Sequence, residues 1–289
     1  MGPGFKYHIV SISAIFFALT IGLVVGSVFV SPQFANRQQA AIIRLQQTLN
    51  SDMEANRREI RQYEETVKTL SPLALKGKLG SSGVAIIQTG DYPEDAISAG
   101  KAIAVAEPRT IVHLVISNSL ERSEDEVRAA LADAHARNAL IPDSRDALCQ
   151  TLATVLAKGD AVELPLLPQC EREGLIRLSP DDNYAAPIKY AVIVGGSRTA
   201  DSTRATRVDA PLIRALLKQG ISVVACEGQN AAASDIPSYR LFRTEISTID
   251  NVDSDIGRCA LVLAFGGPPT PYGVKVSAER LLPSAGGSD

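Results

Sequence analysis

The sequence contains no tryptophan, and only 5% of its 289 residues are aromatic. Histidine and methionine are also scarce, with three and two residues, and the formal net charge is −3 at pH 7. A shortage of aromatic side chains disfavours a surface on which bases stack, and an acidic chain without a basic stripe repels phosphate backbones. These shortages exclude nucleic acid as an expected partner.

Catalytic and metal-binding motifs are missing as well. The four cysteines stand at positions 149, 170, 226 and 259, too far apart for a CxxC redox motif or the usual zinc spacings. The sequence holds no G-x-S-x-G motif, and no histidine stands at catalytic spacing from a cysteine or an aspartate. Cys149 lies on an apolar helix face, as expected of a core residue. Cys170 follows Pro168 in an expected loop and is the cysteine expected to be exposed, and Cys226 is expected at a strand end. We therefore expect a protein that is not an enzyme.

A long apolar run opens the chain. Tyr7 to Val30 contains no charged residue, and a helix of that length spans about 30 Å, the thickness of the hydrocarbon core. The run predicts an uncleaved single-pass membrane anchor within residues 1–31. A cleaved signal peptide is the alternative, although its apolar region is normally about 7 to 15 residues long. Lys6 and Arg37 flank opposite ends, so the side of the membrane on which the rest of the chain lies is left open.

A coiled-coil helix is predicted over residues 32–71. Mostly apolar residues recur there at alternating steps of four and three, with charged and polar residues between them. Such a seam favours a homodimer or higher oligomer; a monomeric helix folded back on the globular domain is the alternative. Ser71–Pro72 is expected to stop the helix, and residues 72–83 read as a linker. The seam positions are Ile42, Gln46, Leu49, Met53, Asn56, Ile60, Tyr63, Val67 and Leu70.

Residues 84–289 are predicted to form an α/β domain. Short runs rich in valine and isoleucine alternate there with amphipathic segments, a pattern typical of parallel strands that are covered on both faces. Ser123 and Glu126 have the spacing of a capping box at the start of one such helix. The fold class is thus a doubly wound, Rossmann-like, mostly parallel sheet. The expected strands are residues 84–90, 110–117, 190–197, 221–228 and 259–267.

Several expected strands end in glycine, at Gly90, Gly195–Gly196, Gly228 and Gly266–Gly267. Ligands of open α/β sheets bind beyond the carboxyl ends of strands, so a small-ligand sensor is a third possibility for the domain. The glycines do not form a GxGxxG or P-loop motif, so we interpret them as turns that leave strands. The acidic run Asp250 to Asp255 lacks the glycine and glutamate spacing of an EF-hand, so it is not interpreted as a metal site.

Two blocks at opposite ends of the chain resemble a known family. "HIVSISAIFFALTIGLVVGS" (His8–Ser27) and "EISTIDNVDSDIGRCALVLAF" (Glu245–Phe265) are similar to signature segments of the MctB family of bacterial copper transporters. The order of anchor, coiled coil and α/β domain is also similar. The resemblance implies a membrane protein of copper homeostasis that assists copper efflux and is described for its mycobacterial member as pore-forming. Copper is then the only metal implied, and Cys170 and Cys226 are the candidate ligands.

The resemblance also allows a different function. Relatives in the family are linked to cell-envelope and division processes, together with a soluble α/β partner protein. On this interpretation the chain is a non-enzymatic scaffold at the cell membrane, and the acidic loop is a docking element. Asp250 and Asp253 are its predicted contact residues.

Overall fold

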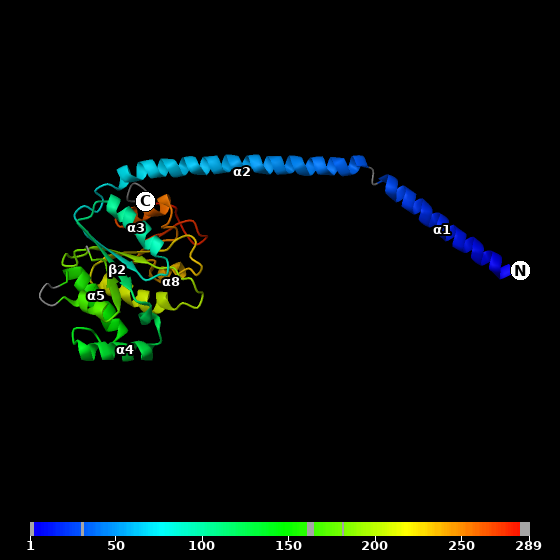
Figure 1. Ribbon diagram of the computed structural model, residues 1–289. Helices are drawn as coiled ribbons and strands as arrows, with labels where there is room; N and C mark the ends of the chain where they lie inside the picture. Colours follow the sequence, from blue (N-terminus) through cyan, green and yellow to red (C-terminus); the bar gives the residue numbers. More distant parts are fainter. Residues whose placement is uncertain (1–2, 30–31, 161–164, 181, 284–289) are drawn as a thin grey trace. The chain divides into compact units, whose positions relative to one another are not determined.

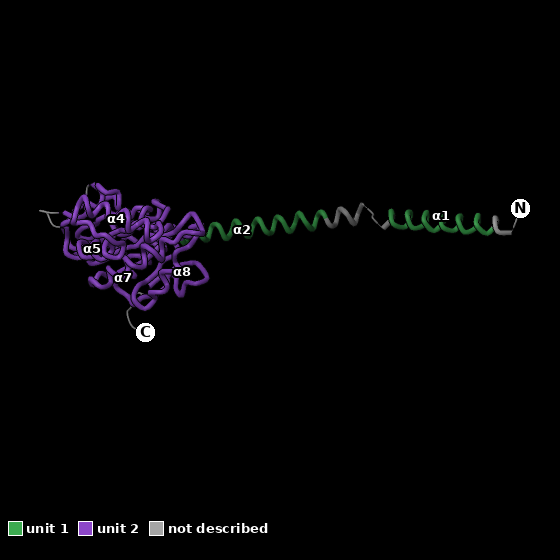
Figure 2. Tube along the Cα trace, turned by 90° about the horizontal axis from the view of Figure 1, so that it is seen from below, with its two compact units in different colours: residues 1–63 green, residues 64–289 purple. Residues whose placement is uncertain are grey.

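The computed structural model describes residues 3–29, 32–160, 165–180 and 182–283 (Figure 1). The chain divides into two compact units, Met1–Tyr63 and Glu64–Asp289, which Figure 2 distinguishes by colour. The first unit contains helix α1 (Pro3–Phe29) and most of helix α2 (Pro32–Leu75). The 21 residues Tyr7–Ser27 of α1 are long and apolar enough to cross a membrane, which confirms the predicted N-terminal apolar helix.

Helix α2 continues past its predicted end. The expected stop at Ser71–Pro72 is wrong, because Pro72 lies inside the helix and α2 ends at Leu75. The amide of Lys76 still donates to the carbonyl of Pro72 at 3.0 Å, so the last turn closes normally. Packing explains the extension: Leu75 is buried, and Val67 packs against the same core of the α/β unit. Burial of this last turn offsets the hydrogen bond that proline cannot donate.

Seven strands form one sheet within the described residues of the second unit, in the order β3-β2-β1-β4-β5-β6-β7. Strand β3 pairs antiparallel with β2, and all other pairs are parallel. This arrangement confirms the predicted doubly wound, mostly parallel sheet. The strands are β1 (Gly83–Gln88), β2 (Thr110–Ile116), β3 (Ile176–Leu178), β4 (Tyr190–Val194), β5 (Ser222–Cys226), β6 (Ser247–Ile249) and β7 (Pro271–Tyr272).

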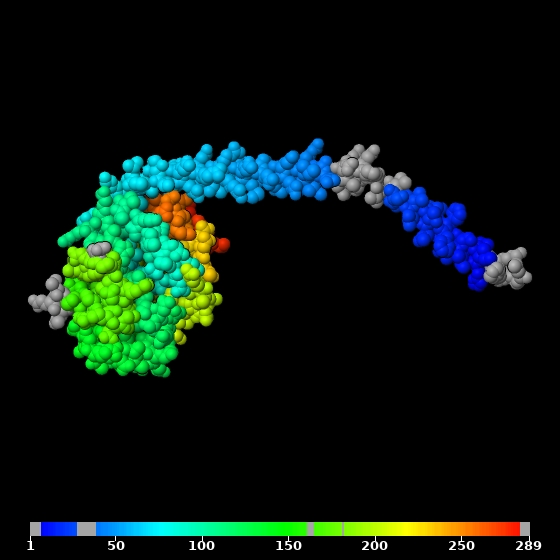
Figure 3. Space-filling view, in the orientation of Figure 1, coloured from blue at the N-terminus to red at the C-terminus, as the bar shows by residue number. Residues whose placement is uncertain are grey.

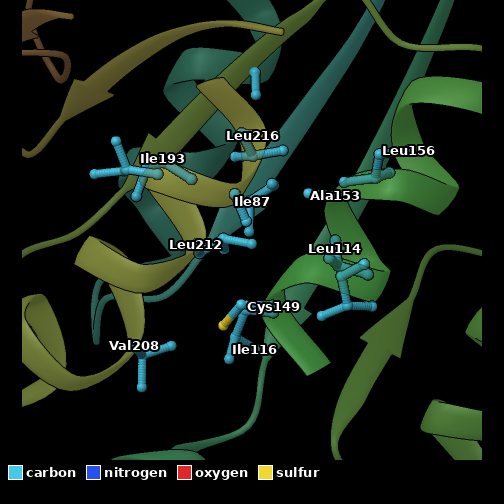
Figure 4. Close-up of a cluster of buried hydrophobic side chains, with 14 of the residues drawn as sticks. Ile87, Leu114, Ile116, Cys149, Ala153, Leu156, Ile193, Val208, Leu212 and Leu216 are labelled. Atoms are coloured by element: carbon cyan, nitrogen blue, oxygen red, sulfur yellow. The ribbon is translucent and has the colours of Figure 1, made fainter. Parts of the chain in front are cut away.

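Two hydrophobic cores lie on opposite faces of the sheet. Side chains of successive strand residues alternate between faces, so Val84 and Ile86 of β1 belong to one core and Ala85 and Ile87 to the other. Figure 1 shows α3 and α5 on opposite sides of the sheet, and Figure 4 shows part of the larger core. The smaller core is completed by the end of α2, α3 (Pro93–Val105) and α9 (Asp255–Ala264). The larger is completed by α4 (Glu124–Arg137), α5 (Arg145–Lys158), α6 (Leu166–Arg172), α7 (Ala210–Lys218) and α8 (Ile236–Tyr239).

One predicted strand is a helix. The apolar run 259–267 was expected to be a strand, but its residues up to Ala264 belong to α9. The side chain of Ser254 caps that helix by accepting a hydrogen bond from the amide of Gly257 at 3.0 Å. The predicted capping box at the start of α4 is confirmed, because Ser123 and Glu126 each accept from the other's amide. Short helical turns η1 (Asn118–Glu121), η2 (Ala205–Asp209) and η3 (Arg240–Phe242) complete the unit.

Candidate functional site

The carboxyl ends of β1 and β4 meet at the point where the strand order reverses, the usual ligand-binding crevice of a doubly wound sheet. In this protein the crevice is closed by backbone contacts. The amides of Thr89 and Gly90 both donate to the carbonyl of Val194, at 3.0 and 2.9 Å. A Cβ atom on Gly90 would collide with the carbonyl of Gly195, so glycine is needed for this close approach. The strand-ending glycines therefore bring the loops after β1 and β4 into direct backbone contact at this point.

A buried arginine ties the neighbouring loops together. Arg204 is only 4% exposed, and its guanidinium contacts Asp91 after β1 and Glu121 after β2, each at 3.1 Å. Burial alone would raise the pKa of Asp91, but the Arg198 amide and the Arg204 guanidinium outweigh that effect and lower it. This ion-pair cluster fixes the loops after three strands, because Arg204 itself follows β4.

Three more carboxyl groups are buried along the same edge. Burial raises the pKa of Asp95 and of Asp235 to about 6 each, and each group accepts a backbone hydrogen bond, from Gly228 and Gly196 respectively. Burial also raises the pKa of Asp209 to about 7. Asp209 accepts a hydrogen bond from the Tyr239 hydroxyl at 2.6 Å, while its other oxygen has no partner among the described residues. Asp95 and Asp235 hold the loops through backbone hydrogen bonds, and the pKa values of all three carboxyl groups lie near neutral pH.

The C-terminal segment is held by two fully buried carboxylates. The ammonium of Lys275 pairs with Glu227 at the end of β5. Asp250, which follows β6, accepts from the amide of Val274 at 2.7 Å and from the amide of Lys275 at 3.2 Å. Arg240 approaches the same carboxylate, with 3.8 Å between Nη2 and Oδ2. The carboxylate of Asp250 therefore binds only groups of the protein itself among the described residues.

This placement corrects the expected docking loop. Asp250 has no exposed surface, so in this conformation it serves the fold rather than a partner. Asp253 is exposed and accepts a hydrogen bond from the amide of Gln229 at 3.0 Å, so docking through Asp253 stays a prediction. Asp255 pairs with Arg258 in the first turn of α9. The sequence alone could not tell that Asp250 is buried and Asp253 exposed, because both residues lie in the same short polar run.

All four cysteines are buried. Cys170 lies in α6 with no exposed surface, so the expectation of an exposed loop cysteine is wrong. Cys226 ends β5 as predicted, and it is also fully buried. Cys149 lies in the larger core as predicted (Figure 4), whereas Cys259 lies within α9 and not at the start of a strand.

The candidate metal ligands are not brought together. Cys170 belongs to the larger core and Cys226 to the smaller, on opposite faces of the sheet. Burial raises the pKa of the Cys170 thiol to about 12, and it raises the pKa of Cys226 well above its ordinary value. Within the described ranges, no three His, Cys, Asp or Glu side chains are grouped so as to hold a metal ion. Binding of Cu(I) by these two thiols stays a prediction, and it would require both access and deprotonation.

An open cavity of about 610 Å³ lies beside the closed crevice, at the ends of β1 and β2 and next to β3. Its polar lining includes Gln88, Ser117, Asn118, Glu171 and Arg177. Sequence reasoning missed this cavity, because its residues come from separate segments and form no motif.

Comparison with known proteins identifies the family. The model of the family described as "Copper transport outer membrane protein, MctB" matches residues 4–283. A protein of Mycobacterium bovis named copper transporter MctB is 23% identical, and the alignment covers 90% of this chain and 91% of the relative. The Mycobacterium leprae protein of the same name is 24% identical, with 96% and 98% covered. Because the match spans nearly the whole chain, this protein belongs to the MctB family.

Proposed function

We propose that this protein acts in copper homeostasis as a single-pass membrane protein and assists copper efflux. The observation that carries the proposal is the family match over residues 4–283, which includes α1, α2 and nearly all of the α/β unit. A match restricted to an apolar helix would carry little information, because such helices share composition without sharing function. The alignments with the relatives named as copper transporters likewise cover 91% and 98% of those proteins.

Helix α1 is the proposed anchor. Its segment Tyr7–Ser27 is wholly exposed, as a lipid-facing helix would be, and its length matches a bilayer. A single helix satisfies its own backbone but encloses no channel. We therefore propose that any copper passage requires association of several chains or a separate transporter.

We further propose that the copper function does not depend on the cysteine thiols. Thiolates, rather than thiols, bind Cu(I), and the reactive form is reached most easily at exposed sites with a lowered pKa. Here burial has the opposite effect on Cys149, Cys170, Cys226 and Cys259, since it raises the pKa of each. The α/β unit would then act through contacts with other proteins.

The test is copper tolerance of a strain from which the gene has been deleted. We expect growth to fail at a lower copper concentration than in the parent strain, and the full chain to restore it. The double variant Cys170→Ala/Cys226→Ala should restore tolerance equally, whereas a chain without residues 7–27 should not. Tolerance equal to the parent in the deletion strain would contradict the copper function.

A non-enzymatic scaffold is the second candidate. The observation in its favour is that apolar side chains at heptad spacing on α2 are exposed, among them Leu49, Met53 and Ile60. Figure 3 draws the atoms of this helix in space-filling form. Such a row favours self-association, and the exposed Asp253 could contact a soluble partner. Changed cell shape in the deletion strain, with unchanged copper tolerance, would favour this candidate over the first.

A further inference from the structure

We propose that the cavity beside β1, β2 and β3 binds a small zwitterion of the amino-acid or short-peptide type. This inference goes beyond the copper function and does not depend on it. The cavity measures about 610 Å³, within the range of about 300 to 1,000 Å³ that is usual for small-molecule sites. It also lies at the carboxyl ends of parallel strands, where open α/β sheets place their ligands.

The cavity exists because helices leave one corner of the sheet uncovered. On the face packed by α3 and α9, the β2 residues Ile111, His113 and Val115 keep part of their surface exposed. The strand register aligns Gln88 of β1 with Val115 of β2, and Val115 with Arg177 of β3. Directly opposed residues project to the same face, so an amide and a guanidinium flank an apolar surface.

The charges in the cavity are of both signs. Arg177 is exposed, and no hydrogen bond or ion pair engages its side chain within the described part of the chain. Glu171 uses one carboxylate oxygen to accept from the amide of Leu178 at 2.8 Å, which leaves Oε2 available. A guanidinium binds a carboxylate through a planar pair of hydrogen bonds, and a carboxylate binds an ammonium group. A ligand that carries both groups would complement both side chains.

The cavity walls are held in place before any ligand arrives. The amide of Ser117 donates to the carbonyl of Leu175 at 3.0 Å, which joins the end of β2 to the turn before β3. The loop after β1 is held by the Asp91–Arg204 pair and by the backbone bonds of the closed crevice. Fixed walls reduce the entropy lost on binding.

The same features disfavour phosphate-bearing ligands. Glu171 borders the cavity with no ion pair to its side chain among the described residues, and its charge repels a nucleotide; Asp91 also borders the cavity, but Arg204 compensates its charge. A zwitterion places its own cationic group near a carboxylate and is not repelled. Its apolar part would lie against Val115 and Pro93.

The experiment is calorimetric titration of the full-length protein in detergent with the dipeptide alanyl-alanine. Two blocked forms serve as matched probes: acetyl-alanyl-alanine lacks the ammonium group, and alanyl-alanine amide lacks the carboxylate. We expect saturable binding of the free dipeptide, and binding of each blocked form weaker by about tenfold or more, since each loses one charge-assisted contact. Equal binding of all three probes, or no saturable binding of the free dipeptide, would overturn the proposal.

Substitutions of the two charged cavity residues test whether the dipeptide binds in this cavity. Arg177→Gln should weaken binding of the dipeptide about tenfold and should not weaken binding of its amide, which has no carboxylate to lose. Glu171→Gln keeps an acceptor for Leu178 and should weaken the dipeptide but not the acetylated form. Arg243→Gln removes an exposed arginine that borders a different cavity, beside Pro271 of β7, and should change nothing. Dipeptide binding that is unaffected by both cavity variants, with circular dichroism showing intact folding, would reject the site.

Discussion

Among single residues, the cysteines give the sharpest prediction. All four are buried free thiols whose pKa is raised by burial, so neither access nor charge favours reaction. We expect a disulfide-exchange reagent such as Ellman's reagent to label the folded full-length protein at pH 8 only very slowly. The same protein in guanidinium chloride should release four equivalents of chromophore at once. Rapid labelling of one or more thiols in the folded protein would contradict the thiol-independent copper function.

The two acids of the expected docking loop should differ strongly in their effect on stability. Asp250→Ala leaves the amides of Val274 and Lys275 and the Arg240 guanidinium without their buried acceptor, which should cost about 2 to 4 kcal/mol of unfolding free energy. Asp253→Ala changes an exposed side chain and should cost within about 0.5 kcal/mol. Calorimetric unfolding of the two variants measures the difference. Equal losses would show that the acceptor role of Asp250 contributes little.

Asp209 predicts how stability depends on pH. Its pKa is raised to about 7 in the folded protein, above about 4 in an unfolded chain, so the folded state favours the protonated form. The resulting stabilisation is complete below about pH 4 and is lost as the pH rises through about 7. Burial makes the largest contribution to this rise in the pKa of Asp209. The polar groups that face the carboxyl are those of Tyr239, Asp235, Thr89 and Arg204.

Asp209→Asn should therefore remove part of that pH dependence. Asparagine keeps the shape and an acceptor for Tyr239, so at pH 8 the variant should be more stable than the wild type by about 2 kcal/mol. At pH 5 the difference should fall to about a third of that value, and it should vanish only below about pH 4. Calorimetric unfolding from pH 5 to 8 tests this, with the exposed Asp133→Asn as the control. A parallel pH profile of variant and wild type would rule out the titration of Asp209.

At the scale of elements, helix α2 carries the prediction of self-association. Its seam side chains between residues 42 and 63 are exposed, for example Leu49 at 53% and Ile60 at 55%. Val67 continues the heptad spacing but packs against the α/β core, so the continuous exposed part of the seam runs from Ile42 to Tyr63, with Leu70 exposed beyond it. If α1 is the proposed membrane anchor, two associated chains would both enter the membrane at their N-termini, and their α2 helices would run parallel.

We predict that the full-length protein is a dimer in detergent and that Leu49→Asp/Ile60→Asp makes it a monomer, since each charge would lie in the apolar seam. Gln47→Asp/Ala55→Asp adds the same charge to the same helix outside the seam and should leave the dimer intact. Sedimentation with matched detergent density distinguishes the two states. A monomeric wild type would reject the seam as a dimer interface.

The elements that the sequence predicted well were those with an unambiguous pattern. Strands β1, β2, β4 and β5 lie within about two residues of their predicted starts, because a buried parallel strand is a continuous run of β-branched residues. The run in α9 has the same apolar density, and a short helix packed on the sheet cannot be told from a strand by composition. Ser254 at its N-cap was the signal that could have decided the case.

At the scale of the whole chain, the order of apolar helix, long helix and α/β unit could be read from the sequence, whereas the site could not. The closed crevice depends on Gly90 meeting Gly195 and on Arg204 reaching two other loops, contacts between residues about a hundred positions apart. The burial of Cys170 likewise follows from how α6 packs, which no local pattern reveals. Residue type alone therefore suggested Cys170 and Cys226 as metal ligands, but the fold places them in different cores.

We propose that the protein assists removal of copper from the cell. Cell-associated copper, measured by mass spectrometry after a defined copper load, tests it most directly. We predict more copper per cell in the deletion strain than in the parent, and restoration of the parental content by both the full chain and the Cys170→Ala/Cys226→Ala variant. Equal copper content in the deletion and parent strains would contradict the claim.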